Sequence, residues 1–216
     1  MAGTLTHGTV QGPPQAPPGG GWGDGGRGGG DGDGRGSSRR RSFAGLFVLL
    51  AATTMVFAAF TTALLLRRGV GDDWAPMPKP RILLVNTGIL FASSVALDMA
   101  RRALRAKRRT SFSGWWTAGT LLGVLFLVGQ CLAWRQLQAA KVFIGDNPSN
   151  AFFYMLTVSH AAHLVGGVTA LIWVDVQALR LRLGPAKRTA IDVCAIFWHF
   201  LDGIWIYLMV LLYVFA

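Results

Sequence analysis

The chain has 216 residues, of which 52% are hydrophobic and 14% are charged, whereas a soluble domain carries about 25% charged residues. Its net charge is +11, but the basic residues lie between apolar runs rather than on one amphipathic face. This placement argues against nucleic acid as the partner and indicates flanking charges that fix membrane topology. The composition predicts an all-α fold, an integral membrane bundle of five transmembrane helices.

Residues 1–41 form a Gly- and Pro-rich segment that ends in three consecutive arginines. Such a segment cannot bury enough apolar surface to become ordered, so we expect a disordered tail. Arg40-Arg41-Ser42-Phe43 resembles a twin-arginine signal. However, the apolar run that follows is longer than the roughly 7–15 residues of a signal-peptide core, which favours a retained helix.

Five apolar runs are long enough for the hydrocarbon core of a bilayer, which needs about 20 helical residues. The predicted spans lie at about 43–66, 82–100, 113–134, 151–179 and 190–215. The segment between the first two contains three prolines and breaks the helix on both sides.

The basic residues predict the orientation. The tail and the second and fourth loops together carry 15 Lys and Arg, whereas the first and third loops carry 6. Because basic loops stay in the cytoplasm, we expect the N-terminus inside and the C-terminus outside.

Small and aromatic residues within the spans suggest packing roles. Gly119 and Gly123 form a small-xxx-small pair that permits close helix approach. The two cysteines, Cys131 and Cys194, have no metal-type partner at short spacing, so we expect buried packing residues. Aromatic residues near span ends are expected to lie at the membrane interface: Trp115, Trp116, Trp134 and Tyr213.

Ionisable residues inside a bilayer are expensive and mark the candidate site. His160 and His163 lie on the fourth span, and His199 and Asp202 lie on the fifth. Both pairs are spaced i,i+3, so each lies on one helix face. At 1.5 Å per residue, His163 and Asp202 lie roughly 18 Å deep from opposite sides. We therefore expect all four residues to meet near the middle of the membrane.

These four residues admit three interpretations. They form a hydrogen-bonded cluster that fixes helix register, a lipid or proton site, or a bis-histidine site for a b-type haem. The haem needs a gap of several ångströms, for which directly packed helices leave little room.

Other embedded polar residues are expected to form hydrogen bonds between helices: Asn86, Thr87, Ser93, Ser94 and Gln130. Asp98, Asp175 and Asp192 lie near span ends and are expected to pair with basic residues. The sequence contains no nucleophile–base pair, phosphate loop or Cys/His metal motif. The residues alone therefore favour a structural or accessory membrane subunit.

Four stretches resemble subunit III of the haem–copper respiratory oxidases. The fourth span contributes Phe152-Phe153-Tyr154-Met155-Leu156-Thr157, His160, His163 and Gly166-Gly167. The fifth contributes Phe197-Trp198-His199-Phe200-Leu201-Asp202 and Trp205. The weaker stretches are Asn86-Thr87 with Leu90 and Ser93-Ser94, and Gly123 with Phe126 and Gln130. The resemblance covers about residues 42–216. Within the family, this chain is similar to the short, five-helix form.

The resemblance implies a non-catalytic core subunit of a bacterial terminal oxidase in the inner (plasma) membrane. It implies packing against subunit I, which holds haem and copper, in a complex with subunit II. It also implies bound phospholipid, support of proton uptake and complex stability, and no haem or metal in this chain. Many members of that family carry a glutamate in the helix matching the first span. Here the position is about Thr53 and the chain contains no glutamate, so a role of that carboxylate is not carried over.

Other functions remain open at this point. Subunit III of a quinol oxidase, or a relative associated with nitric-oxide reductase, would share these motifs, since the electron donor is decided in other subunits. A stand-alone haem-binding electron carrier would use His160, His163 and His199. A small transporter is disfavoured because no inverted repeat or pair of broken helices is visible.

Overall fold

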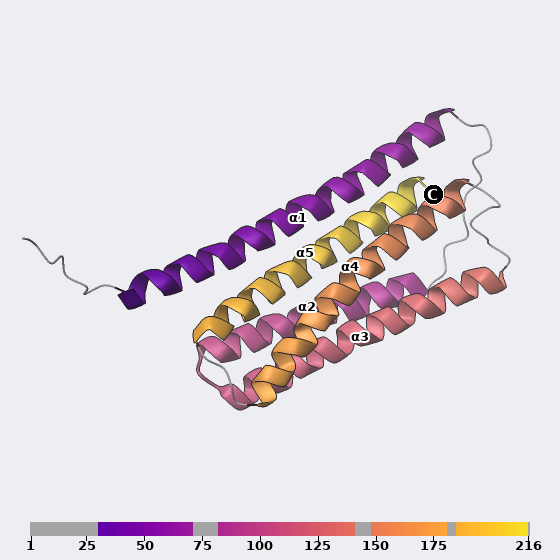
Figure 1. Ribbon diagram of the computed structural model, residues 1–216. Coiled ribbons are helices and arrows are strands. Elements are labelled where there is room, and N and C mark those ends of the chain that lie inside the picture. Colours follow the sequence, from indigo (N-terminus) through magenta and orange to yellow (C-terminus); the bar gives the residue numbers. More distant parts are fainter. Residues whose placement is uncertain (1–29, 71–81, 141–147, 181–184, 216) are drawn as a thin grey trace, which may run out of the picture.

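The computed structural model describes residues 30–70, 82–140, 148–180 and 185–215, and in this part of the chain the regular structure is helical. In order, the helices are α1 (Gly30–Val70), α2 (Ile82–Arg105), α3 (Arg109–Ala139), α4 (Pro148–Leu179) and α5 (Pro185–Phe215) (Figure 1). All five are long and apolar enough to cross a membrane, which confirms the predicted all-α class and the five spans. Each helix contains its predicted span and extends beyond it at one end or at both.

The start of α1 differs from the prediction. Helix begins at Gly30, within the segment expected to be disordered up to residue 41. Extending an existing helix adds one hydrogen bond per ordered residue and needs no new nucleus, so polar residues outside the apolar span continue it. The rest of the predicted tail, residues 1–29, lies outside the described residues.

α5 is the central helix of the bundle. It contacts α1, α2 and α4, and 61% of its apolar span is buried against 17% for α1. Figure 1 shows α1 on the outside of the bundle beside α5, with α2 and α3 paired on the other side. Lipid tails are as apolar as leucine, so the apolar side chains on the outer face of α1 are stable in a membrane.

The closest helix contact joins α2 and α3, where glycines replace side chains. A Cβ added at Gly119 would lie 2.8 Å from Leu97 Cδ2, and one added at Gly129 would lie 2.0 Å from Asn86 Oδ1. Because the backbones approach this closely, Ser93 Oγ donates a hydrogen bond of 2.8 Å to the carbonyl oxygen of Gly119. Gly123, the second member of the predicted pair, faces another way, since its Cβ would lie 2.6 Å from the Trp198 ring of α5.

A tight turn connects α2 to α3. The Lys107 N–H donates to the carbonyl of Leu104 at 3.1 Å, and the Arg108 N–H donates to the carbonyl of Ala103 at 3.0 Å. These bonds are the Schellman pattern, in which the residue after the helix adopts a left-handed conformation. Lys107 occupies that position with φ 60°, where glycine is usual, so α2 ends abruptly and the chain reverses into α3.

One stripe of α1 faces the bundle. Leu46, Thr53, Phe57 and Leu64 are the buried residues among its described side chains. Their spacing of seven, four and seven residues keeps them on one helix face. This inner stripe of α1 places the Thr53 position inside the protein rather than in lipid.

Several sequence expectations about packing are corrected. Trp116 is fully buried and its Nε1 donates to the carbonyl of Leu171 at 3.1 Å. Trp134, which is partly buried, donates to the Thr157 hydroxyl at 3.2 Å, so both rings link α3 to α4, and Trp116 is enclosed by the bundle rather than exposed at its surface. Cys131 is exposed and Cys194 only partly buried, because helix rotation turns apolar residues of a span to lipid as readily as inward.

Gly123→Ala is expected to destabilise the folded chain by about 1–3 kcal/mol, because the new methyl group would overlap the buried Trp198 ring. The measurement is the midpoint of unfolding in mixed micelles, followed by circular dichroism. Gly166→Ala is the matched control, since no atom lies within 4 Å of that added Cβ. Alanine there should be neutral or stabilise the helix by up to about 1 kcal/mol. Equal destabilisation by the two substitutions would contradict the close contact at Gly123.

Candidate functional site

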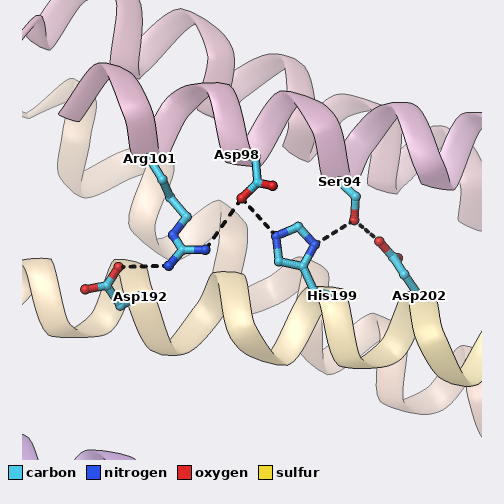
Figure 2. A network of polar contacts seen from close by, with 6 residues as sticks. All are labelled: Ser94, Asp98, Arg101, Asp192, His199 and Asp202. Atoms are coloured by element: carbon cyan, nitrogen blue, oxygen red, sulfur yellow. Dashed lines mark hydrogen bonds and ion pairs between the residues drawn. The ribbon is translucent and has the colours of Figure 1, made fainter. Parts of the chain in front are cut away.

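A chain of polar contacts crosses the interface between α2 and α5. Figure 2 shows six side chains in this α2–α5 chain: Ser94, Asp98 and Arg101 from α2, and Asp192, His199 and Asp202 from α5. The spacing of each set of three follows the helical repeat, so each set lies on one face of its helix. The two helices run in opposite directions, so the first of the three residues on α2 lies near the last of the three on α5. Ser94 is beside Asp202, Asp98 is beside His199, and Arg101 is beside Asp192.

His199 lies in the middle of the α2–α5 chain. Its Nδ1 is 2.9 Å from Ser94 Oγ, and its Nε2 is 3.3 Å from Asp98 Oδ1. Ser94 Oγ also donates to Asp202 Oδ2. A hydroxyl has one donor and two acceptor sites, so Ser94 serves two partners at once.

Arg101 closes the other end of the α2–α5 chain. One guanidinium nitrogen lies 3.5 Å from Asp98 Oδ1, and another lies 3.5 Å from Asp192 Oδ1. The planar fork of arginine suits two carboxylates. The predicted ion pairing of Asp98 and Asp192 is therefore confirmed. Asp175 differs, because its Oδ1 accepts a hydrogen bond of 2.8 Å from Thr117 on α3.

His160 of α4 packs among aromatic rings from other helices. The ring is 1% exposed, and its centroid lies 6.3 Å from that of Phe57, 6.5 Å from Phe126 and 5.1 Å from Trp205. These rings come from α1, α3 and α5, so His160 packs where four helices meet. Neither of its ring nitrogens has a hydrogen-bond partner among the described residues.

His163 lies one turn further along α4 and also faces α1. Its ring centroid is 5.8 Å from that of Phe57, and its Nδ1 donates to the carbonyl of Ser159 at 2.8 Å. The four residues expected to meet therefore form two groups. His160 and His163 pack toward α1, whereas His199 and Asp202 face α2. An i,i+3 spacing places two residues on one face but does not say which neighbour that face meets.

Two of the remaining polar candidates link helices directly. Thr87 accepts a hydrogen bond of 3.0 Å from Trp205 Nε1, which joins α2 to α5. Ser93 donates to α3, as described above. Asn86 and Gln130 are each 1% exposed. Asn86 Nδ2 and both polar side-chain atoms of Gln130 have no partner among the described residues.

Thr53 lies on the inner stripe of α1 and is 1% exposed. Its hydroxyl donates to the carbonyl of Leu49 at 2.9 Å. A threonine can satisfy its hydroxyl within its own helix in this way. The position at which many members of the resembled family carry a glutamate is thus buried, neutral and hydrogen-bonded locally.

Sequence reasoning missed the positions of Arg101 and Trp205 in these groups. Arg101 was counted only as one of the basic residues that fix topology, although its i,i+3 spacing from Asp98 indicated an ion pair. Trp205 was quoted only as part of a motif, and nothing in the sequence showed that its ring would reach His160 while its Nε1 reached Thr87.

The chemistry available to these residues is hydrogen bonding and proton exchange. Within the described ranges, no group of three or more His, Cys, Asp or Glu side chains is placed to hold a metal ion. The α2–α5 chain instead places an imidazole and a hydroxyl between two carboxylates. Such groups hold two helices together and exchange protons with one another.

Arg101→Gln should lower the free energy of unfolding by about 0.5–1 kcal/mol at low salt, because it removes a partly exposed bridge between α2 and α5. The unfolding midpoint in mixed micelles measures the effect, and it should shrink at high salt as the charges are screened. Arg102→Gln, at the neighbouring exposed position, is the control and should change stability less. Equal, salt-independent losses in both variants would contradict the bridge.

Comparison with known proteins identifies the family. Residues 43–216 match the family described as cytochrome c oxidase subunit III. A protein of Mycobacterium tuberculosis named probable cytochrome c oxidase subunit 3 is 30% identical over 173 residues, which cover 78% of this chain and 85% of that protein. Cytochrome c oxidase subunit 3 of Synechocystis is 28% identical over 179 residues, covering 78% of this chain and 73% of that protein. This chain therefore belongs to the cytochrome c oxidase subunit III family.

Proposed function

We propose that this chain serves as a non-catalytic core subunit of a bacterial terminal oxidase of the cytochrome c oxidase type. Membership of the subunit III family places it in such an oxidase. The proposal adds that the chain packs against the subunit carrying haem and copper. It also adds that the chain binds phospholipid and supports proton uptake and the stability of the complex.

The non-catalytic role is supported by the polar side chains, which form hydrogen bonds between helices. Described hydrogen bonds join α2 to α3, α2 to α5, α3 to α4 and α1 to α5. Side chains used in this way fix the rotation and register of neighbouring helices. A rigid bundle with a defined outer surface is what a core subunit offers its partner.

The outer surface supports contact with lipid and with a membrane-embedded partner. Phe47, Met55 and Leu66 on α1 are 65%, 72% and 66% exposed. Side chains of this kind are stable only against lipid tails or another apolar surface. The chain is therefore a multi-pass membrane protein, for which we propose the bacterial plasma membrane.

The orientation proposed for the bundle is N-terminus inside and C-terminus outside. The end of α2 carries the dense basic cluster, and the ion pair of Arg101 with Asp192 brings the start of α5 to the same end of the bundle. Positive-inside logic places this end in the cytoplasm.

Co-purification tests the functional proposal. The tagged chain, extracted in mild detergent from its own cells, should bring down subunits that carry haem and copper, identified by mass spectrometry and visible absorption. A chain that purifies alone with stoichiometric haem, lost in His163→Ala, would replace the proposal with a haem-binding electron carrier. Partners typical of a quinol oxidase or a nitric-oxide reductase would change the type of complex.

Asp202→Ala should reduce the yield of the complex more than the turnover of the complex that does assemble. The substitution removes the carboxylate that accepts from Ser94 at the α2–α5 interface, and the loss of one such hydrogen bond costs about 0.5–1.5 kcal/mol. Asp202→Asn is the matched control, because an amide still accepts from Ser94, and it should assemble nearly normally. Normal yield of the Asp202→Ala complex with abolished oxygen reduction would refute the structural role.

Reporter fusions test the orientation. Alkaline phosphatase fused to the C-terminus should be active, because this end is proposed to lie outside, whereas a fluorescent protein fused there should remain dark. Fusions after Lys107, in the turn between α2 and α3, should give the opposite result. An inactive phosphatase at the C-terminus would reverse the proposed orientation.

A further inference from the structure

The two ends of the α2–α5 chain lie in different environments. The side chain of Asp98 is 50% exposed and that of His199 is 32% exposed, whereas Asp202 is 9% exposed. The two carboxylates lie on different helices, Asp98 on α2 and Asp202 on α5, and His199 and Ser94 lie between them in space (Figure 2). The arrangement therefore links an accessible carboxylate to a buried one through two groups that can exchange protons.

Ser94 makes this link continuous. Its hydroxyl reaches His199 Nδ1 at 2.9 Å and Asp202 Oδ2, while the other ring nitrogen of His199 reaches Asp98 at 3.3 Å. A hydroxyl can donate to either partner while it accepts from the other. Imidazole likewise can gain a proton at one nitrogen and release one from the other.

We propose that Asp98, His199, Ser94 and Asp202 form a proton-transfer chain that loads and unloads the buried Asp202 carboxyl from the accessible end of α2. Before transfer, Asp98 is protonated, His199 carries its proton on Nδ1, and the Ser94 hydroxyl donates to ionised Asp202. Three protons then shift by one place. The Asp98 O–H bond breaks as a bond forms at His199 Nε2, the Nδ1 proton moves to Ser94, and the Ser94 proton moves to Asp202.

The step balances without any other reactant. Asp98 ends as a carboxylate, Asp202 ends as a carboxylic acid, and His199 ends neutral with its proton on the opposite nitrogen. One negative charge has moved from Asp202 to Asp98, where Arg101 lies 3.5 Å away. The same hops in reverse return the proton, so the chain acts as a reversible store.

The charged and titratable groups around the chain come from few elements. Arg101 of α2 faces Asp98, and Asp192 of α5 faces Arg101. On α4, His160 and His163 face Phe57, and Asp175 bonds to Thr117. On α1, the described charged residues lie toward its ends, and its Thr61 accepts from Tyr207 of α5. Among the described residues, Arg101 is thus the cation that compensates the negative charge of Asp98 at the accessible end of the chain.

The proton-transfer chain is the means by which this subunit would support proton uptake, and only this physiological role rests on the proposed function. Its test uses the purified full-length chain in lipid nanodiscs, so it succeeds or fails independently of co-purification. A rapid pH drop is followed by time-resolved infrared spectroscopy of the carbonyl stretch of protonated carboxylic acids. Asp202→Asn assigns the band, because this variant should lack it.

Ser94→Ala removes the linking hydroxyl but leaves His199 and Asp202 in place. The rate at which the Asp202 band appears should fall by about 100-fold or more, the usual effect of losing a positioned proton donor. Ser94→Thr restores a hydroxyl and should recover the rate to within a few-fold. Ser93→Ala is the matched control, since the neighbouring serine bonds to α3, and it should leave the rate unchanged even if stability falls.

Three results would overturn the proposal. The first is a band that persists in Asp202→Asn, and the second is a wild-type rate in Ser94→Ala. The third is equal slowing in Ser93→Ala and Ser94→Ala, which would indicate a general loss of packing. Circular dichroism verifies that each variant is folded. If Ser94→Ala does not fold, His199→Gln takes its place, because glutamine keeps hydrogen bonds but cannot pass a proton from one ring nitrogen to the other.

Discussion

The close approach of α2 and α3 is the contact on which the rest of the bundle depends. Glycines at 119 and 129 let α2 pack closely against the α3 backbone and so fix the rotation of α2, with Ser93 on the side that bonds to Gly119. Successive residues of a helix point about 100° apart. With Ser93 directed at α3, Ser94 is therefore turned toward α5, and Asp98 and Arg101 follow it on the same face.

The motif residues of the last two helices consequently have separate tasks. On α5, the face with His199 and Asp202 meets α2, while Trp205 reaches both Thr87 and the ring of His160. On α4, the two histidines meet the rings of α1, α3 and α5. One short stretch of α5 thus contacts both sets of polar residues. The histidines of α4 pack against aromatic rings, whereas the α2–α5 chain ends at the charged side chains of Asp98 and Arg101.

Much of this architecture could be predicted from the sequence, because hydrophobic run length and basic loops are strong signals in a membrane protein. Such local patterns predicted the five spans, the close helix approach at Gly119, and the ion pairs that Asp98 and Asp192 each form with a basic residue. The rotation of α5 about its own axis could not be predicted, since the spacing of His199 and Asp202 allows their face to turn either to α4 or to α2. Burial of Trp116 could not be predicted for the same reason, because position along a span does not reveal which way a side chain points. The helical start at Gly30 was missed because composition describes what a segment does alone, not what it does as the continuation of a stable helix.

The three-residue connection at Lys107 has a consequence for how the protein is made. Because α2 reverses directly into α3, their contact is local in sequence and requires little loop-closure entropy. We therefore expect α2 and α3 to pack as a helical hairpin once residues up to Ala139 have been synthesised, before α4 and α5 are available. The polar face of α2 is still open in that hairpin, and α5, which comes later in the chain, supplies the side chains that cover it. A chain that lacked α5 would therefore leave the carboxylate of Asp98 and the guanidinium of Arg101 without their partners on that helix.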